Sequence, residues 1–314
     1  MKDRTIAVDV GGTQIRAALF DADAKILRQR ADVTDAAAGA DAIYARLSAN
    51  IRAIADDWSR VRGIGIGAPG PLDPFRGIIR FAPNLSGLNN FPLKDRIEQD
   101  FQIPAFIGND ANLAALAEHR YGAGRGATDM IYVTISTGIG GGIIAGGKLF
   151  LGARGFAGEV GHQTLDANGP RCKCGNVGCL EALAAGPAIE RAVRAELARG
   201  RASALREPFT GADVTRTAKS GDALALEIFA RAGHFIGLGL VNLLHLFDPQ
   251  FFVLGGSVAR HAWDFLFPAI HTTFEKNAMP IMRADARILP AQLGDDVGLS
   301  GAYALVNGEM TDEE

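Results

Sequence analysis

The chain has 314 residues, of which 48% are apolar and 21% charged, and its formal net charge is −3. This length and composition are typical of a globular protein with about two domains. A slightly acidic chain without a Lys/Arg run lacks the charge pattern of a nucleic-acid binder. The amino end lacks the layout of a signal peptide, and no apolar stretch reads as long and uncharged enough to span a bilayer. We therefore expect a soluble, cytoplasmic protein with neither a nucleic-acid nor a membrane partner.

The first part of the chain alternates short runs of β-branched residues with turns. These runs predict strands at 5–10, 15–20, 25–29, 61–67 and 103–107. Apolar residues with helical spacing predict a helix over 42–57 that packs on this sheet. An Ala/Leu-rich helix is expected from Asp110 to His119, followed by a hinge near 121–126.

The opening pattern then recurs in the second half. Residues 7–13 and 134–140 share the order of a strand and a Gly-rich turn, and each is followed by a returning strand, which indicates a duplicated core. Further helices are predicted at 183–199, 214–220, 223–247 and 299–306, with a strand at 251–254. The sequence thus predicts an α/β protein of two similar halves with a cleft between them. The expected domains are 1–120, joined by the C-terminal helix 299–314, and 121–298.

One Gly-rich turn follows the first strand of each half. Gly11, Gly12 and Thr13 form one, and Thr137 with Gly138 lies in the other. Successive backbone N–H groups in such turns bind phosphate chains, although ordinary turn chemistry also favours glycine. Asp9 ends its strand, where a carboxylate can hold Mg²⁺ directly or through water. Neither a Walker A motif nor a dinucleotide fingerprint is present.

Asn109 and Asp110 stand where a predicted strand meets a predicted helix. Both residue types are favoured as helix N-caps. Strand ends that face a cleft are also where catalytic carboxylates are usually found. The residues alone favour neither interpretation.

All three cysteines of the chain, Cys172, Cys174 and Cys179, follow His162 within one short segment. Three thiolates and an imidazole make up a typical tetrahedral ligand set of structural zinc. Zinc would then fix a loop that carries Glu159 and Glu181. Buried structural cysteines are the alternative interpretation, and the odd count argues against a disulfide framework.

Taken together, these segments resemble the ROK family of repressors, open reading frames and sugar kinases, within the actin-like ATPase and hexokinase fold (ribonuclease H-like). The resemblance covers essentially the whole chain. It rests on segments 9–13, 67–71, 83–85, 108–112, 136–142, 158–162, 172–181 and 255–257. The Cys-rich segment is highly specific to this family and favours zinc.

The resemblance implies an ATP-dependent kinase that phosphorylates the 6-hydroxyl of a hexose, with Asp110 as the general base. The sugar hydroxyls would be held by Asn84, Asn109, Glu159, His162 and Glu181, with Gly70 lining the floor. The nucleotide would be bound by Asp9 (through Mg²⁺), Gly11, Gly12, Thr13, Thr137, Gly138, Gly255 and Gly256. Structural Zn²⁺ would be held by His162, Cys172, Cys174 and Cys179.

Family members act on several sugars, among them glucose, N-acetylglucosamine, N-acetylmannosamine, fructose and allose. Glu159 fits glucose or N-acetylglucosamine, and segments 81–88 and 109–112 are most similar to members that act on glucose, which we therefore favour. ATP is favoured over polyphosphate as the donor, and a homodimer or homotetramer is expected.

Two other functions are weighed against the kinase. A sugar-responsive regulator needs a helix-turn-helix before Asp9, where only eight residues stand. A sugar-binding protein without catalysis would not need Asp110 and both phosphate turns.

Overall fold

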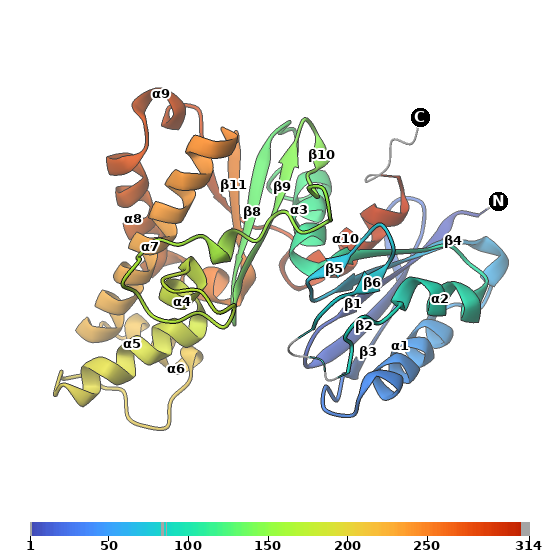
Figure 1. Cartoon of the computed structure of the whole chain (residues 1–314), viewed down its shortest axis with the longest axis horizontal. Coiled ribbons are helices and arrows are strands. Elements are labelled where there is room, and N and C mark those ends of the chain that lie inside the picture. The colour runs from blue at the N-terminus through green and yellow to red at the C-terminus, as the bar shows by residue number, and fades with distance from the viewer. Residues whose placement is uncertain (1, 83–84, 86, 309–314) are drawn as a thin grey trace. The chain divides into compact units, whose positions relative to one another are not determined.

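The computed structural model describes residues 2–82, 85 and 87–308 (Figure 1). Its two five-stranded sheets have the same internal order. When the strands of each sheet are counted along the chain, the third, second, first, fourth and fifth lie side by side. The first sheet contains β3 (Ile26–Val33), β2 (Gln14–Phe20), β1 (Arg4–Val10), β4 (Val61–Ala68) and β7 (Ala105–Asn109). The second contains β10 (Lys148–Leu149), β9 (Ile139–Ala145), β8 (Met130–Ile135), β11 (Phe251–Gly255) and β12 (Arg287–Pro290). The predicted duplication is therefore confirmed.

The chain divides into two compact units. Unit 1 comprises Met1–Gly126, Gly142–Gly158 and Leu293–Glu314, and unit 2 comprises Ala127–Gly141 and Glu159–Gln292. In each sheet the fourth and fifth strands run parallel to their neighbours, while the hairpin at the opposite edge is antiparallel. The domain limits expected from the sequence, 1–120 with 299–314 and 121–298, stay a prediction.

The central strands of the first sheet are buried on both faces because they alternate apolar side chains between two cores. Ile6 and Val8 of β1 belong to the core with α1 (Ala40–Ile54), and α2 (Leu93–Phe101) contributes to the same core. Ala7, between them, belongs to the core with α3 (Asp110–Tyr121) and α10 (Val297–Val306). This is the two-residue period of a strand. A small hairpin of β5 (Leu72–Asp73) and β6 (Ile78–Ile79) also belongs to this unit.

The C-terminal helix α10 packs closely on β4 because two positions there have no side chain. A Cβ atom at Gly65 would lie 1.9 Å from the carbonyl oxygen of Ala302, and one at Gly63 would lie 2.6 Å from Val306. Helix and sheet therefore pack backbone to backbone at this point. The segment after Leu293 completes the second core of unit 1.

Unit 2 is built around α7 (Ala223–Phe247), which packs against α8 (Gly256–Asn277). The helices approach closely at Gly233 and Gly237, where added Cβ atoms would lie 2.6 Å from Leu266 O and 2.8 Å from Ile270 O. Shorter helices also pack here or lie nearby: α4 (Leu180–Ala184), α5 (Gly186–Ala198), α6 (Gly211–Lys219) and α9 (Pro280–Arg283). Single-turn 3₁₀ helices occur at Trp58–Arg60, Val160–His162 and Gly294–Asp296.

The sequence-based expectation about apolar stretches is wrong for α7. Among the described residues this helix is long and apolar enough to cross a bilayer by length and composition, with a mean hydropathy of 1.5. Its apolar window is, however, 61% buried in the fold. That burial is what a core helix of a globular unit shows, so its composition is weak evidence for a membrane span.

Candidate active site and metal centre

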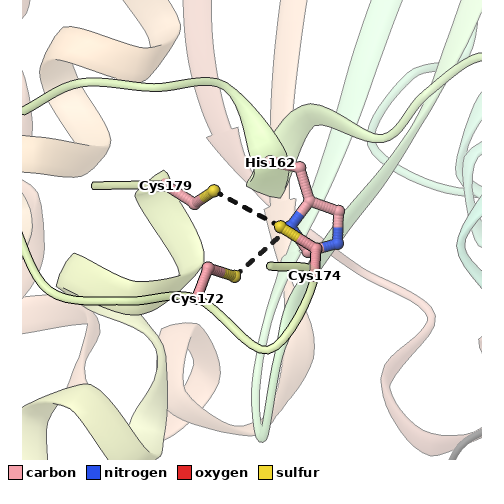
Figure 2. Close-up of side chains that lie close together, drawn as sticks. All are labelled: His162, Cys172, Cys174 and Cys179. Carbon is pink, nitrogen blue, oxygen red and sulfur yellow. Dashed lines mark hydrogen bonds between the residues drawn. The ribbon is translucent and has the colours of Figure 1, made fainter. Parts of the chain in front are cut away.

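Four side chains predicted to hold zinc converge in unit 2 (Figure 2). One ligand atom from each of His162, Cys172, Cys174 and Cys179 lies within 4.8 Å of the others. Cys172 Sγ is 3.7 Å from His162 Nδ1, and the Sγ atoms of Cys174 and Cys179 are also 3.7 Å apart. Three sulfur atoms and one imidazole nitrogen at this spacing fit a tetrahedral zinc ion.

The loop that carries the three cysteines, residues 172–179 (the cysteine loop), keeps its shape through close backbone contacts. Asn176 O accepts a hydrogen bond from Cys172 N at 2.8 Å, and Cys172 O accepts one from Gly175 N at 3.1 Å. Gly178 has a φ of 67°, and a Cβ atom there would lie 1.6 Å from Asp166 O. Only glycine fits this position, both for its backbone conformation and for lack of space.

Burial affects the three thiols unequally. It raises the pKa of the Cys179 thiol to about 12 and also raises the pKa of Cys172. The pKa of the exposed Cys174 is lowered, mainly by the backbone hydrogen bond from Asn176. Zinc binds the thiolate form of cysteine, and burial disfavours that form at Cys179. A bound cation would therefore have to stabilise the negative charge of the Cys179 thiolate.

His162 links this cluster to a carboxylate. Its Nδ1 atom faces the thiols, while Nε2 lies 3.8 Å from Glu159 Oε2. Glu159 is exposed, and His162 is half-buried at the end of a 3₁₀ turn. The imidazole thus presents one nitrogen to the cysteine thiols and the other toward an exposed acidic group.

Glu181 joins the cysteine loop to the Gly-rich turn between β8 and β9. It lies in the first turn of α4, and its Oε2 accepts a hydrogen bond from Ile139 N at 3.0 Å. Its Oε1 is 3.8 Å from Cys172 Sγ. A Cβ atom at Gly138 would lie 2.6 Å from Glu181 Oε2, so glycine lets the carboxylate approach the turn.

The same turn lies close to two helix starts in unit 2. Ser136 O accepts a hydrogen bond from Gly186 N at 2.9 Å, where α5 begins. Ser136 Oγ is 2.8 Å from Ser257 Oγ in the first turn of α8. Gly256 has a φ of 87°, and a Cβ atom there would lie 2.5 Å from Ile135 O. Helix N-termini next to a Gly-rich turn form a favourable environment for phosphate groups.

The structure therefore brings Gly138 close to Glu181, and Gly256 close to Ile135 at the end of β8, just before Thr137. Gly186 and Ser257 also lie here, although neither was predicted to have a role in the site. The Gly-Pro pair at 186–187, which is typical of a helix start, was the signal available for Gly186. Ser257 belongs to segment 255–257, on which the family resemblance rests, but no role was predicted for it.

In unit 1, Asn109 is the N-cap of α3. Its Oδ1 accepts hydrogen bonds from Ala111 N at 3.0 Å and Asn112 N at 3.2 Å. Asp110 is the first residue of the helix and is exposed, and its Oδ1 also accepts from Ala111 N, at 2.8 Å. Asn109 thus takes the capping role, which the sequence left open between capping and catalysis.

Gly70 lies next to this helix start, since a Cβ atom there would be 3.4 Å from Asn109 Nδ2. The other sugar-site prediction nearby, Asn84, lies outside the described residues.

The first Gly-rich turn joins β1 to β2 in unit 1. Gly11 N donates to Gln14 O at 2.9 Å, and Thr34 Oγ1 donates to Gly11 O at 2.7 Å. Gly12 and Thr13 are exposed. Asp9, at the end of β1, is 2.6 Å from Arg16 through Oδ2 and the guanidinium NH2. Arg16 also lies 3.7 Å from Asp296, and neither residue was predicted from the sequence to belong to the site.

Comparison with known proteins shows similarity along nearly the whole chain. The ROK family profile matches residues 5–309. The glucokinase of Halalkalibacterium halodurans is 36% identical over 330 residues, which cover 100% of this chain and 98% of that protein. The N-acetylglucosamine repressor of Escherichia coli O157:H7 is 32% identical over 97% of this chain but only 75% of the repressor.

Two solved structures show the same similarity in three dimensions. The ROK hexokinase of Thermus thermophilus has a TM-score of 0.79 and 38% identity, covering 96% of this chain and 97% of that one. A ROK glucokinase of Streptomyces griseus, solved in complex with glucose and AMPPNP, has a TM-score of 0.81 and 36% identity. That comparison covers 95% of this chain and 97% of the Streptomyces chain.

Proposed function

The chain belongs to the ROK family, and we propose that it is an ATP-dependent hexose kinase that transfers the γ-phosphoryl group to the 6-hydroxyl of glucose. The observation that carries this proposal is full-length similarity to glucokinases, one of them solved with glucose and an ATP analogue. The fold supports it as well, since both halves present a Gly-rich turn after their first strand.

Phosphoryl transfer depends mainly on positioning and charge stabilisation, because its transition state is loose. In our proposal Asp110 accepts the proton of the attacking 6-hydroxyl, a role typically worth a factor of about 10² to 10⁴. Its exposed position at the start of α3 leaves the carboxylate accessible, and Asn109 caps the helix beside it. Gly70 would leave room for the sugar next to Asn109.

The sugar hydroxyls would be bound by Asn84 and Asn109 and by Glu159, His162 and Glu181. Support for the last three comes from their link to the cysteine loop. His162 Nδ1 and Glu181 Oε1 both lie near Cys172, and Glu159 lies near His162 Nε2. Structural zinc, when bound, would hold the loop and the imidazole in a fixed orientation. A rigid set of polar groups is what recognition of a polyhydroxylated ligand requires.

The phosphates would be bound by Gly11, Gly12 and Thr13 and by Thr137 and Gly138, and the adenosine would lie against Gly255 and Gly256. Mg²⁺, when bound with the nucleotide, would neutralise phosphate charge, with Asp9 as its carboxylate partner. The acidic group at the end of β1 fits this role, since carboxylate oxygen is a ligand that Mg²⁺ prefers.

A panel of sugars tests the proposal directly. ADP release is measured with glucose, N-acetylglucosamine, N-acetylmannosamine, fructose, mannose and allose at matched concentrations, with ATP or polyphosphate as the donor. We expect the highest kcat/KM with glucose and ATP. A preference for an N-acetylhexosamine would keep the kinase and correct its substrate. The absence of sugar-dependent ADP release would contradict the proposal.

A sugar-responsive regulator is the second candidate, because the repressor of Escherichia coli is 32% identical over nearly all of this chain. The same panel separates the two, since a regulator without catalysis would bind sugar and release no ADP. A homodimer or homotetramer stays a prediction, which sedimentation velocity tests.

A further inference from the structure

The Asp9 carboxylate is held on two sides within unit 1. Asp9 and Arg16 are directly opposite each other in the antiparallel β1–β2 pair, and their side chains meet at 2.6 Å. On another side, a Cβ atom at Gly298 would lie 2.8 Å from the Asp9 carboxylate. Gly298 is in the first turn of α10, so the carboxylate lies against the start of a helix. This approach is possible because residue 298 is glycine.

Arg16 contacts two carboxylates with the two ends of its guanidinium. The Nη2 atom of Arg16 contacts Asp9, and its Nη1 atom lies 3.7 Å from Asp296 Oδ1. The side chains of Arg16 and Asp9 are only 18% and 20% exposed, whereas that of Asp296 is 53% exposed. A lysine ammonium is a single point of charge and lacks this planar fork.

Together, Arg16, Asp9 and Asp296 carry a net negative charge close to the Gly11–Thr13 turn. Arg16 contributes one positive charge, and Asp9 and Asp296 contribute two negative charges. If Arg16 were only a neutralising counter-charge, its removal would strengthen binding of a cation. If Arg16 instead fixes the direction of Asp9, its removal would weaken binding of a metal bridged to phosphate. The two roles therefore predict opposite results.

We infer that Arg16 is a positioning residue of the nucleotide site, which orients Asp9 toward the metal–phosphate complex. The inference rests on the proposed function and adds to it a residue that determines affinity for the magnesium nucleotide, not for the hexose. Groups that orient a metal-binding side chain typically cost about 10- to 100-fold in metal affinity when they are removed. Asp296 has the lesser role, because its contact with Arg16 is longer and more exposed.

The test compares Arg16→Gln and Arg16→Lys with Arg28→Gln. Arg28 lies in β3 of the same sheet and forms an ion pair of 2.8 Å with Asp56, but both side chains are more than half exposed. Calorimetry gives the affinity for ADP with and without Mg²⁺, and also the affinity for glucose. Thermal unfolding shows that each variant is folded.

We expect the gain in ADP affinity that Mg²⁺ provides to fall about tenfold in Arg16→Gln. Glucose affinity should stay unchanged, and Arg28→Gln should behave as the wild type. Arg16→Lys should lose part of the gain, because it keeps the charge without the fork. If Arg16→Gln does not fold, the measurement on Arg16→Lys decides.

An unchanged or increased Mg²⁺ effect in Arg16→Gln, or full recovery in Arg16→Lys, would overturn the inference. A wild-type protein that binds no ADP would overturn the proposed function as well, so the two failures can be told apart.

Discussion

The two units hold their candidate functional groups by different means. In unit 1, Asp9 ends a strand and Asp110 begins a helix, so hydrogen-bonded backbone fixes both. In unit 2, Glu159 and His162 come from a segment with little regular structure, next to a loop that gathers three cysteines. Regular elements fix the backbone that carries a side chain, whereas an irregular loop can be fixed by a cross-link such as a metal ion. A change at Asp110 should therefore act on turnover, and a change in the cysteine loop of unit 2 on sugar affinity and stability together.

The largest effect is expected from Asp110→Asn. Loss of the general base should lower kcat by about 10² to 10⁴, while glucose still binds, because the amide keeps the size of the side chain. Steady-state kinetics and glucose calorimetry measure the two effects. Asp95→Asn, an exposed acidic residue in the first turn of α2, is the matched control and should leave kcat unchanged. A variant at position 110 that keeps most of its kcat would show that this carboxylate is not the base.

A smaller effect is expected from removal of one metal ligand by Cys174→Ala. The loop should lose its zinc, so the KM for glucose should rise about tenfold and the melting temperature should fall in parallel. Bound zinc is measured by atomic absorption, and wild-type enzyme treated with a chelator should show the same changes. Lys173→Ala, at the exposed neighbouring position, serves as the control. A zinc-free protein with wild-type KM would separate the metal from sugar binding.

The smallest effect concerns alkaline pH in the metal-free protein. Burial raises the pKa of Cys179 from 9.0 to about 12, so its protonated form stabilises the fold below pH 9. This stabilisation is lost as the pH rises from 9.0 toward about 12. The lowered pKa of Cys174 has the opposite sign, and its contribution is complete by the ordinary value of 9.0.

Chelated protein should therefore melt at progressively lower temperature above pH 9, as followed by circular dichroism. Chelated Cys179→Ala should show a shallower decline. Equal slopes in the two proteins would exclude this thiol as the cause.

Elements with strong local patterns were predictable from the sequence. The periodic residues Ile43, Leu47, Ile51 and Ile54 are all buried in α1, and α7 has the predicted limits. The helix α8 was missed because Pro268 interrupts its sequence pattern. The helix itself is irregular, with non-helical backbone at Ala262. The helix α2 was missed because it is short, with Leu93 and Ile97 as its buried residues, and no side chain caps it. One helix was expected at 183–199, but Ala185 separates α4 from α5.

The candidate site shows the same limit. The convergence of His162 and the three cysteines was predictable because all four lie within a short stretch of chain whose residue types match a zinc ligand set. The contact of Arg16 with Asp296 joins residues from opposite ends of the sequence, so it depends on how α10 packs against the first sheet. The hydroxyl pair of Ser136 and Ser257 likewise joins residues that are 121 positions apart. Such contacts leave no trace in local spacing.

The close packing of α10 on Gly63 and Gly65 also has a consequence for biosynthesis. Leu299 and Ala302 complete a core whose other members were translated much earlier, among them Ala7 and Ala18. A nascent chain on the ribosome therefore exposes part of one apolar face of its first sheet, beside Leu113 and Leu116 of α3, until the segment with α10 emerges. Unit 2, whose residues all precede that segment, can fold first. A chain stalled before residue 293 should bind chaperones and be cut by protease in its first 126 residues, whereas the released chain should resist.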